Sequence, residues 1–213
     1  MGRGGAAPEQ EGQRRGERAK RAAGDGVSDR VTIEPESFTL VDFDREELAG
    51  VVESLLDAIG LDRSVVLEID QTTPLGEARV VSLEPDVRLF LESGAIEDPK
   101  RLRQLTPSGA ANVLGRLLFR VRDRLDPAFG DPPPDGDLGL ERSTAWDVYA
   151  VGRLVRLGFR HENDRQRRLY QFRTRHGFHD ASDAAFEALW AGDALTWADV
   201  ERLSAEALAG AAA

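Results

Sequence analysis

The stretch DREELAGVVESLLDAIG, residues 44–60, carries the clearest helical pattern in the chain. Its apolar residues recur at the spacing that places them on one face of a helix. Asp44 can cap this helix, Glu47 occupies the capping-box position, and Gly60 can end it. The pattern predicts a helix that buries one side against a neighbouring layer. The apolar residues are Leu48, Val51, Val52, Leu55, Leu56 and Ile59.

The segments on either side of this helix alternate apolar and polar residues, as half-buried strands do. Residues 31–41 predict a strand near a sheet edge, because Pro35 cannot donate to a strand ladder. Residues 64–70, 78–83 and 86–92 predict three further short strands. Their short connections favour antiparallel pairing, since a parallel pair needs a crossover of a dozen or more residues.

Residues 107–126 predict a second helix with one apolar face. Thr106 precedes it as a cap, and Pro107 lies in the first turn, where its missing N–H costs nothing. Three arginines recur at four-residue spacing, and we expect them on a solvent face. The apolar residues are Ala110, Leu114, Leu117, Leu118, Val121 and Leu125, and the arginines are Arg116, Arg120 and Arg124.

These elements predict an α+β fold: a small, mainly antiparallel sheet with two amphipathic helices on one face, followed by a helical C-terminal half. By composition the chain divides into a disordered tail (1–30), an α+β domain (31–130), a proline-rich connector (131–137) and a helical C-terminal region (138–210). The tail has too few apolar residues to bury a core, and the connector favours a stiff, polyproline-like conformation. The helical region can be a second domain or part of the first.

In the C-terminal region, Thr144 is placed to open a helix, with Asp147 at its capping-box position. Two further capped helices close the chain. Residues 159–176 lie before them and fit two structures. They can form a short basic helix over 164–175, or a hairpin that turns around 162–164.

Residues 153–176 form a basic island in an acidic chain, whose formal net charge is −10. The island holds eight arginines against two acids, whereas residues 31–152 hold twelve basic and twenty-four acidic groups. Such a contrast in charge bears on the electrostatic field of the protein and on its binding partners, and not on its fold. It predicts a site for an acidic partner surface, or else ion pairs with the acidic surface of residues 31–152. The candidate partner-binding residues are Arg156, Arg160, Arg165, Arg167, Arg168, Tyr170, Arg173 and Arg175.

Residues 157–170, LGFRHENDRQRRLY, resemble the helix-to-wing passage of winged-helix regulators. In that family a helix ends at a glycine, and an arginine-rich hairpin reaches the phosphate backbone of DNA. The resemblance implies a nucleic-acid-binding regulator in which Arg165, Arg167 and Arg168 contact phosphates, with Tyr170 beside them.

The order of predicted elements over residues 44–126 resembles that of small zincin-type metallopeptidase domains, with a helix, three strands and an amphipathic helix. In that family the last helix carries HExxH, whose two histidines bind zinc while the glutamate serves as base. Residues 112–120, NVLGRLLFR, contain neither histidine nor glutamate. The resemblance therefore implies a degenerate domain that cannot hydrolyse a substrate at that site.

Motifs that would assign a reaction are missing from the sequence. It contains no GxxxxGKS/T or GxGxxG phosphate-binding loop, no GxSxG nucleophile elbow and no cysteine. His176 and His179 are weak metal candidates, because Gly177 interrupts the helix that they would share. We therefore expect no cofactor and no bound metal, and we interpret the two histidines as polar residues at a helix start.

These observations favour a non-catalytic adaptor or regulatory protein that binds an acidic partner through the basic island. An enzyme is the competing class. No apolar run approaches the ~20 residues needed to cross a bilayer, and the N-terminus has no apolar signal region. We therefore expect a soluble, cytoplasmic protein without a membrane partner. The sequence leaves the oligomeric state open.

Overall fold

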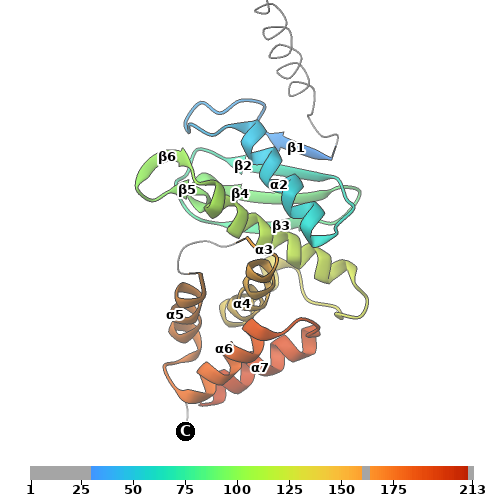
Figure 1. The fold of residues 1–213 in the computed structure, drawn as a ribbon, viewed down its shortest axis with the longest axis vertical. Coiled ribbons are helices and arrows are strands. Elements are labelled where there is room, and N and C mark those ends of the chain that lie inside the picture. The colour runs from blue at the N-terminus through green and yellow to red at the C-terminus, as the bar shows by residue number, and fades with distance from the viewer. Residues whose placement is uncertain (1–29, 160–163, 211–213) are drawn as a thin grey trace, which may run out of the picture.

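The computed structural model describes residues 30–159 and 164–210. The fold is α+β, as the sequence predicts, with a sheet layer towards one end of the molecule and a group of helices towards the other (Figure 1). The predicted disordered tail, apart from Arg30, lies outside the described residues, and so does the candidate site residue Arg160. Within the described ranges, no helix is long and apolar enough to cross a membrane.

Four strands form the main sheet in the order β1-β2-β4-β3. The pairs β1–β2 and β2–β4 are parallel and the pair β3–β4 is antiparallel, so the prediction of a mainly antiparallel sheet is wrong. The reason is that β4 inserts between β2 and β3. Residues 71–86, which include β3, thereby form the crossover that a parallel pair requires. The strands are β1 (Val31–Glu34), β2 (Val65–Asp70), β3 (Ala78–Ser82) and β4 (Val87–Glu92).

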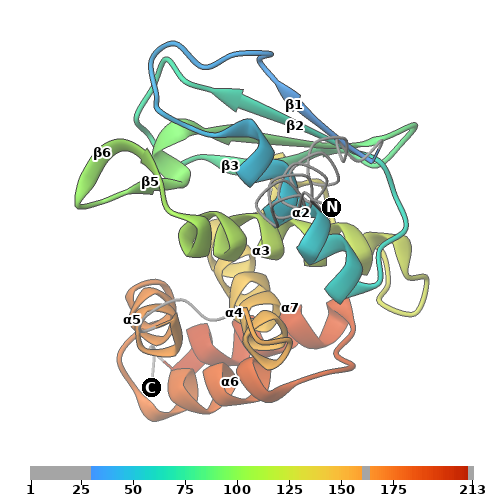
Figure 2. The same ribbon diagram turned by 45° about the horizontal axis from the view of Figure 1, so that its top comes forward.

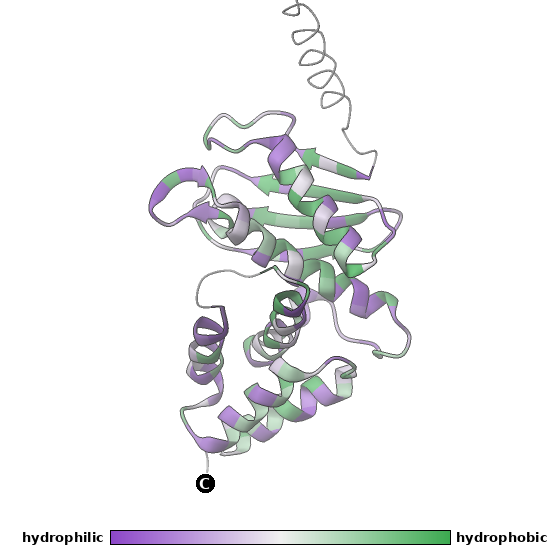
Figure 3. Cartoon of the chain, in the orientation of Figure 1, coloured by the Kyte–Doolittle hydropathy of each residue, from purple (hydrophilic) through white to green (hydrophobic). Residues whose placement is uncertain are grey.

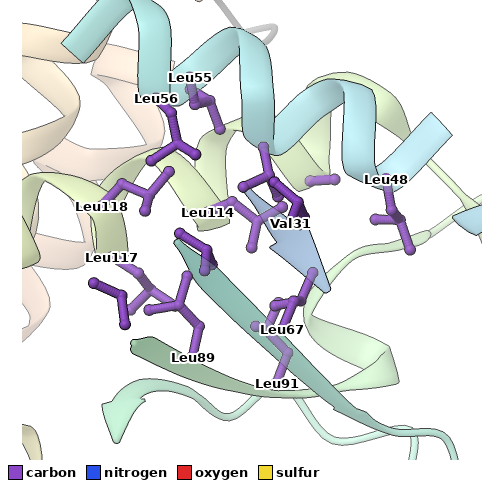
Figure 4. Close-up of a cluster of buried hydrophobic side chains, with 14 of the residues drawn as sticks. Val31, Leu48, Leu55, Leu56, Leu67, Leu89, Leu91, Leu114, Leu117 and Leu118 are labelled. Carbon is purple, nitrogen blue, oxygen red and sulfur yellow. The ribbon is translucent and has the colours of Figure 1, made fainter. Parts of the chain in front are cut away.

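Helices α2 (Arg45–Ile59) and α3 (Pro107–Leu125) cover one face of this sheet, as predicted (Figure 2). The Asp44 carboxylate caps α2 by accepting hydrogen bonds from two first-turn amides, at 2.8 and 3.2 Å. Gly60 ends the helix in the left-handed region, at φ 73°, which favours glycine. Leucines of both helices meet leucines of β2 and β4 in a core of aliphatic side chains (Figure 4).

The main sheet leads into α3 through the short helix η1 (Ser93–Ala95) and a small hairpin of β5 (Glu97–Asp98) and β6 (Arg101–Leu105). After α3, the proline-rich connector contains a second short helix, η2 (Asp135–Asp137). The hairpin and the connector therefore lie at opposite ends of α3.

The helical half consists of α4 (Leu140–Arg156), α5 (Asp164–His176), α6 (Asp180–Ala191) and α7 (Trp197–Ala209). Helix α4 lies between α3 on one side and α6 and α7 on the other (Figure 2). Aromatic side chains supply most of the bulk of this second core, and they are Phe129, Trp146, Tyr149, Phe172, Phe186 and Trp197.

Helix α5 decides between the two structures that the sequence allowed for the basic island. Residues 164–176 are helical, so the hairpin is wrong, and so is the winged-helix arrangement that depends on it. The reason is packing, because Phe172 is fully buried in the aromatic core and Leu169 packs against it from the same helix face. The remaining surface of α5 is mostly hydrophilic (Figure 3).

Candidate anion-binding groove

An open groove of about 630 Å³ lies between the first half of α3 and helix α5. Gly109, Asn112 and Arg116 line it from α3, and Arg167 and Arg175 line it from α5. Thr144 and Asp147 of α4, Glu97 of β5 and residues of nearby loops complete the lining. The α+β half and the helical half therefore both contribute to one concave surface, as pockets between structural units often do.

Asp147 of α4 is the acidic centre of the groove. Its carboxylate pairs with the guanidinium of Arg116, lies 2.7 Å from Arg120, and lies 3.7 Å from Arg168. Burial alone would raise the pKa of this carboxyl group, but the three positive charges lower its pKa to about 2. The predicted capping role of Asp147 is wrong, because α4 begins at Leu140 and places the residue inside the helix.

Asp135 of the connector extends this ionic cluster away from the groove. Its buried carboxylate lies 3.3 Å from Arg120 and 2.6 Å from Arg124, and it accepts a hydrogen bond of 2.8 Å from the amide of Val80 in β3. The acid therefore satisfies one backbone donor on an edge strand and neutralises two arginines. It also fixes the connector to both α3 and the sheet.

The prediction that Arg116, Arg120 and Arg124 lie on a solvent face is wrong. Their side chains are 17%, 5% and 9% exposed. The physical reason is that α4 and the connector cover this side of α3. Asp147 of α4 pairs with Arg116 and Arg120, and Asp135 of the connector pairs with Arg124. Four-residue spacing identifies residues on one face of a helix, but it does not show what lies opposite that face.

A second ionic contact closes the interface between α3 and α4 beyond the groove. Asp123 accepts hydrogen bonds from Trp146 Nε1 at 2.7 Å and from the two terminal nitrogens of Arg153 at 2.7 and 2.6 Å. The Arg153 guanidinium also lies 3.7 Å from the ring centroid of Tyr149. Arg153 is therefore engaged within the fold.

Arg168 lies deep in the wall of the groove and is 8% exposed. It donates to Asn112 Oδ1 and to Gln171 Oε1, both at 3.0 Å, and Asn112 in turn donates to Asp164 at 3.0 Å. Burial lowers the pKa of Arg168 to about 9, and the positive charge of Arg116 is the next cause. The guanidinium stays charged at neutral pH, with Arg116 and Arg167 opposing its charge and Asp147 and Asp164 favouring it.

Three of the predicted partner-binding arginines are engaged with the neighbouring helix α6 or the turn after it. Arg156 donates to two backbone oxygens and to Asp193, each at 2.6 Å. Arg165 pairs with Glu187, and Arg173 donates to Asp183 at 2.7 Å. These pairs support the intramolecular alternative, but their acids follow the basic island instead of belonging to residues 31–152.

Arg167 and Arg175 differ from the other predicted residues. Both are exposed, both line the groove, and neither has a hydrogen bond or ion pair with any residue of the described ranges. Tyr170 lies between them in sequence, is 65% exposed, and meets Phe178 edge-on at a centroid distance of 6.0 Å. The structure therefore brings Arg167, Arg168, Tyr170 and Arg175 to the groove and directs the other described candidates elsewhere.

The two histidines are engaged within the helical half. His176 is buried, donates from Nδ1 to the Phe172 carbonyl at 3.1 Å, and accepts at Nε2 from the Ser204 hydroxyl at 2.9 Å. His179 caps α6 by accepting from the Ser182 amide at 3.2 Å. In residues 30–159 and 164–210, no group of three or more His, Cys, Asp or Glu residues could hold a metal ion.

The contribution of α3 to the groove was missed in the sequence. Asn112 and Arg116 lie four residues apart on α3 and both line the groove. The signal that could have revealed this face is the polar series Asn112, Arg116 and Arg120, which runs along a helix whose other face is apolar. No protein family, curated protein or solved structure matches this chain significantly.

Proposed function

We propose that this chain is a non-catalytic adaptor or regulatory protein that binds an acidic segment of a partner protein in the groove between α3 and α5. The observation that carries this proposal is the pair Arg167 and Arg175, two exposed cations on the groove wall without an acidic partner in the described ranges. Guanidinium groups bind carboxylates and phosphates with two parallel hydrogen bonds. A groove with such groups available suits an anionic ligand.

The length of the groove supports an extended peptide as the ligand. Its α3 wall runs from Thr106 to Arg116, and ten residues of helix rise about 15 Å. An extended chain advances about 3.3 Å per residue, so roughly four or five residues of a partner can lie along this wall. Tyr170 offers an aromatic contact on the opposite wall.

The acids of the groove are poorly suited to proton transfer. The pKa of Asp147 is about 2, so this carboxylate is a weak base at neutral pH. Glu97 accepts from the Ser93 hydroxyl at 2.9 Å and from the Arg103 amide at 3.2 Å. These engagements favour a binding role over a catalytic role. A cysteine-free chain suits a reducing compartment, so the proposal includes a cytoplasmic location.

Nucleic acid is the less favoured ligand. Of the three arginines that the winged-helix resemblance assigned to phosphates, Arg165 pairs with Glu187 on α6 and Arg168 lies deep in the groove wall, so Arg167 alone is both exposed and without a partner in the described ranges. Duplex DNA therefore serves as an alternative probe in the test below.

The test measures fluorescence anisotropy of labelled decaglutamate with the wild-type chain and with Arg167→Ala/Arg175→Ala. We expect the double variant to bind about tenfold more weakly, equivalent to about 1.4 kcal/mol, because two charge-assisted contacts are lost. The matched control is Arg122→Ala/Arg142→Ala, which removes two arginines outside the groove and changes the net charge equally. Equal losses of affinity in both double variants would mean that the change in net charge alone accounts for the weaker binding. Tighter binding of duplex DNA that fades between ~50 and ~200 mM salt would favour the nucleic-acid alternative.

A further inference from the structure

We propose that the acidic segment held in the groove is phosphorylated, with a phosphoserine or phosphothreonine placed against the guanidinium groups of Arg116, Arg167 and Arg168. This inference rests on the proposed function and assigns the ligand chemistry within the same groove. It follows from how the three arginines converge, from how few acids neutralise them, and from the donors that they leave available.

Two of these arginines approach the same carboxylate oxygen atom. Asp147 Oδ2 pairs with Arg116 Nη1 and lies 3.7 Å from Arg168 Nη1, so the guanidinium of α3 and that of α5 flank the same carboxylate oxygen. Arg167 is adjacent to Arg168 and lines the same groove. Three arginines from two helices thus line one groove, and the charge of Arg167 is felt at Arg168. Such clusters are the usual protein site for a phosphoryl group.

The acids near this cluster do not neutralise it. The ionisable side chains that line the groove are four arginines and two acids, Glu97 and Asp147, apart from Tyr170. Asp147 is also shared with Arg120 at 2.7 Å, and Glu97 is engaged by Ser93 and by the Arg103 amide. Counted over the whole groove, with Arg175 included, the lining has a formal excess of two positive charges. This excess matches a phosphoryl group, which carries about −1.5 to −2 at pH 7, better than it matches one carboxylate.

Two of the three arginines, Arg116 and Arg167, have hydrogen-bond donors without an acceptor in the described ranges. Arg116 Nε is buried and has no acceptor in the described ranges, and Arg167 donates to no described residue. A phosphoryl group offers three strong acceptor oxygens, whereas a carboxylate offers two. The additional oxygen gives the third arginine an acceptor, so the site should discriminate between phosphoserine and glutamate.

The test uses three fluorescein-labelled pools of degenerate heptapeptides whose central residue is phosphoserine, glutamate or serine. Anisotropy titration of the wild-type chain should show the phosphoserine pool binding at least about tenfold more tightly than the glutamate pool. Inorganic phosphate should compete with the phosphoserine pool. Arg167→Ala should lower the preference for phosphoserine over glutamate at least about fivefold.

Two matched variants separate the phosphoryl site from general charge. Arg167→Lys keeps the charge but loses the planar pair of donors, so it should restore binding to both pools without restoring the full preference. Arg175→Ala removes another exposed groove arginine, one outside the cluster, so it should weaken both pools by the same factor. Thermal melting curves of all variants should overlay, because neither arginine has a partner in the described ranges.

The outcomes distinguish this inference from the function on which it rests. Equal affinity for the phosphoserine and glutamate pools would overturn the phosphoryl site and leave the acidic-segment groove intact. No binding of any pool, together with no binding of decaglutamate, would overturn both. An unchanged preference in Arg167→Ala would place the phosphoryl group elsewhere, and tighter binding of a thymidine oligonucleotide that displaces the phosphoserine pool would replace the peptide with a nucleic acid.

Discussion

The two sides of helix α3 are held by different chemistry. On the sheet side, Leu114, Leu117 and Leu118 meet leucines of α2, β2 and β4, and this contact contains aliphatic carbon alone (Figure 4). On the α4 side, ion pairs lie beside the apolar contacts of Ala150 and Leu154. There Arg116 and Arg120 share Asp147. Burial is nearly the same, because Leu117 is 1% exposed and the side chain of Arg120 is 5% exposed.

The difference shows why the sheet side of α3 accepts many apolar partners, whereas the α4 side requires particular ones. Aliphatic side chains pack against any apolar surface of suitable volume. A buried guanidinium needs an acceptor at a defined position, since the cost of leaving it unpaired exceeds the gain from pairing it. The sheet side of α3 therefore determines that the helix is buried, and the α4 side determines how the helical half is oriented on it.

The largest effect should come from placing a charge on the apolar side of α3. Leu117→Asp should unfold the protein, because it buries a carboxylate without a cationic partner. Circular dichroism and a thermal melt measure the effect. Leu102→Asp is the control, because Leu102 is 80% exposed and the substitution should leave the melt unchanged. A soluble Leu117→Asp protein with the wild-type melting curve would contradict the packing of α3 on the sheet.

The next largest effect should come from removing the central acid of the α4 side. Asp147→Ala leaves three buried or half-buried guanidinium groups without their shared carboxylate, and we expect a loss of about 3–5 kcal/mol in the free energy of unfolding. Urea denaturation measures the loss. The control is Asp183→Ala, which breaks the more exposed pair with Arg173 and should cost about 0.2–1 kcal/mol. Similar costs for the two substitutions would mean that burial does not distinguish the two ion pairs.

The sequence predicted the sheet side of α3 well, for a reason that its residues make clear. Ala110, Leu114, Leu117 and Val121 recur at helical spacing, and such a stripe needs no knowledge of its partner to be recognised as buried. Strand direction could not be predicted in the same way. The insertion of β4 between β2 and β3 depends on contacts across the whole sheet, and short connections suggested the opposite arrangement.

The sequence pointed to the α5 wall of the groove but not to its α3 wall. Charge counting found Arg167 and Arg175 because the basic island stands out in an acidic chain. It could not separate them from Arg165 and Arg173, whose acids lie on α6, since that pairing depends on how two helices meet. Arg116 escaped detection because a polar stripe on an amphipathic helix usually faces solvent.

A smaller loss is expected where α4 and α6 approach closely without charge. A Cβ atom on Gly152 would lie 2.3 Å from the backbone oxygen of Trp190, so Gly152→Ala must push the two helices apart. We expect a cost of about 1–3 kcal/mol from this overpacking, measured by urea denaturation. Gly115→Ala is the control, because its Cβ would meet side-chain atoms of Leu154, which can rotate. A cost no greater than that of the control would mean that α6 moves freely relative to α4.

The helical half should also respond to pH through one buried group. Burial lowers the pKa of His176 below its usual 6.5, and the hydrogen bond to the Phe172 carbonyl and the charge of Glu141 oppose this change only in part. The unfolded chain therefore binds a proton at a higher pH than the folded chain does. The stability that results is complete above pH 6.5 and is lost as the pH falls through the folded-state pKa.

Measurements of the free energy of unfolding between pH 7 and pH 5 test whether stability falls as the pH falls. His176→Gln should flatten the dependence, because its amide can hydrogen-bond without titrating. His179→Asn is the control, since asparagine can still cap α6 and His176 remains in place. A wild-type stability that rises on acidification over this range would contradict the assignment to a neutral, buried imidazole.

The smallest effect should appear on the outer side of α2, away from both the aliphatic contacts and the buried ion pairs that hold α3. Gly50 is exposed in the middle of the helix, and a Cβ atom there would meet nothing within 4 Å. Gly50→Ala should therefore stabilise the protein by about 0.5–1 kcal/mol, because alanine loses less backbone entropy in a helix than glycine does. A thermal melt measures this gain as an increase of about 1–4 °C. Gly60→Ala is the control and should destabilise, because its φ of 73° strains any side chain. A loss of stability in Gly50→Ala would mean that another surface covers this side of α2 in solution. Helix α2 would then be buried on two sides, and only one of them would be the side that packs on the sheet.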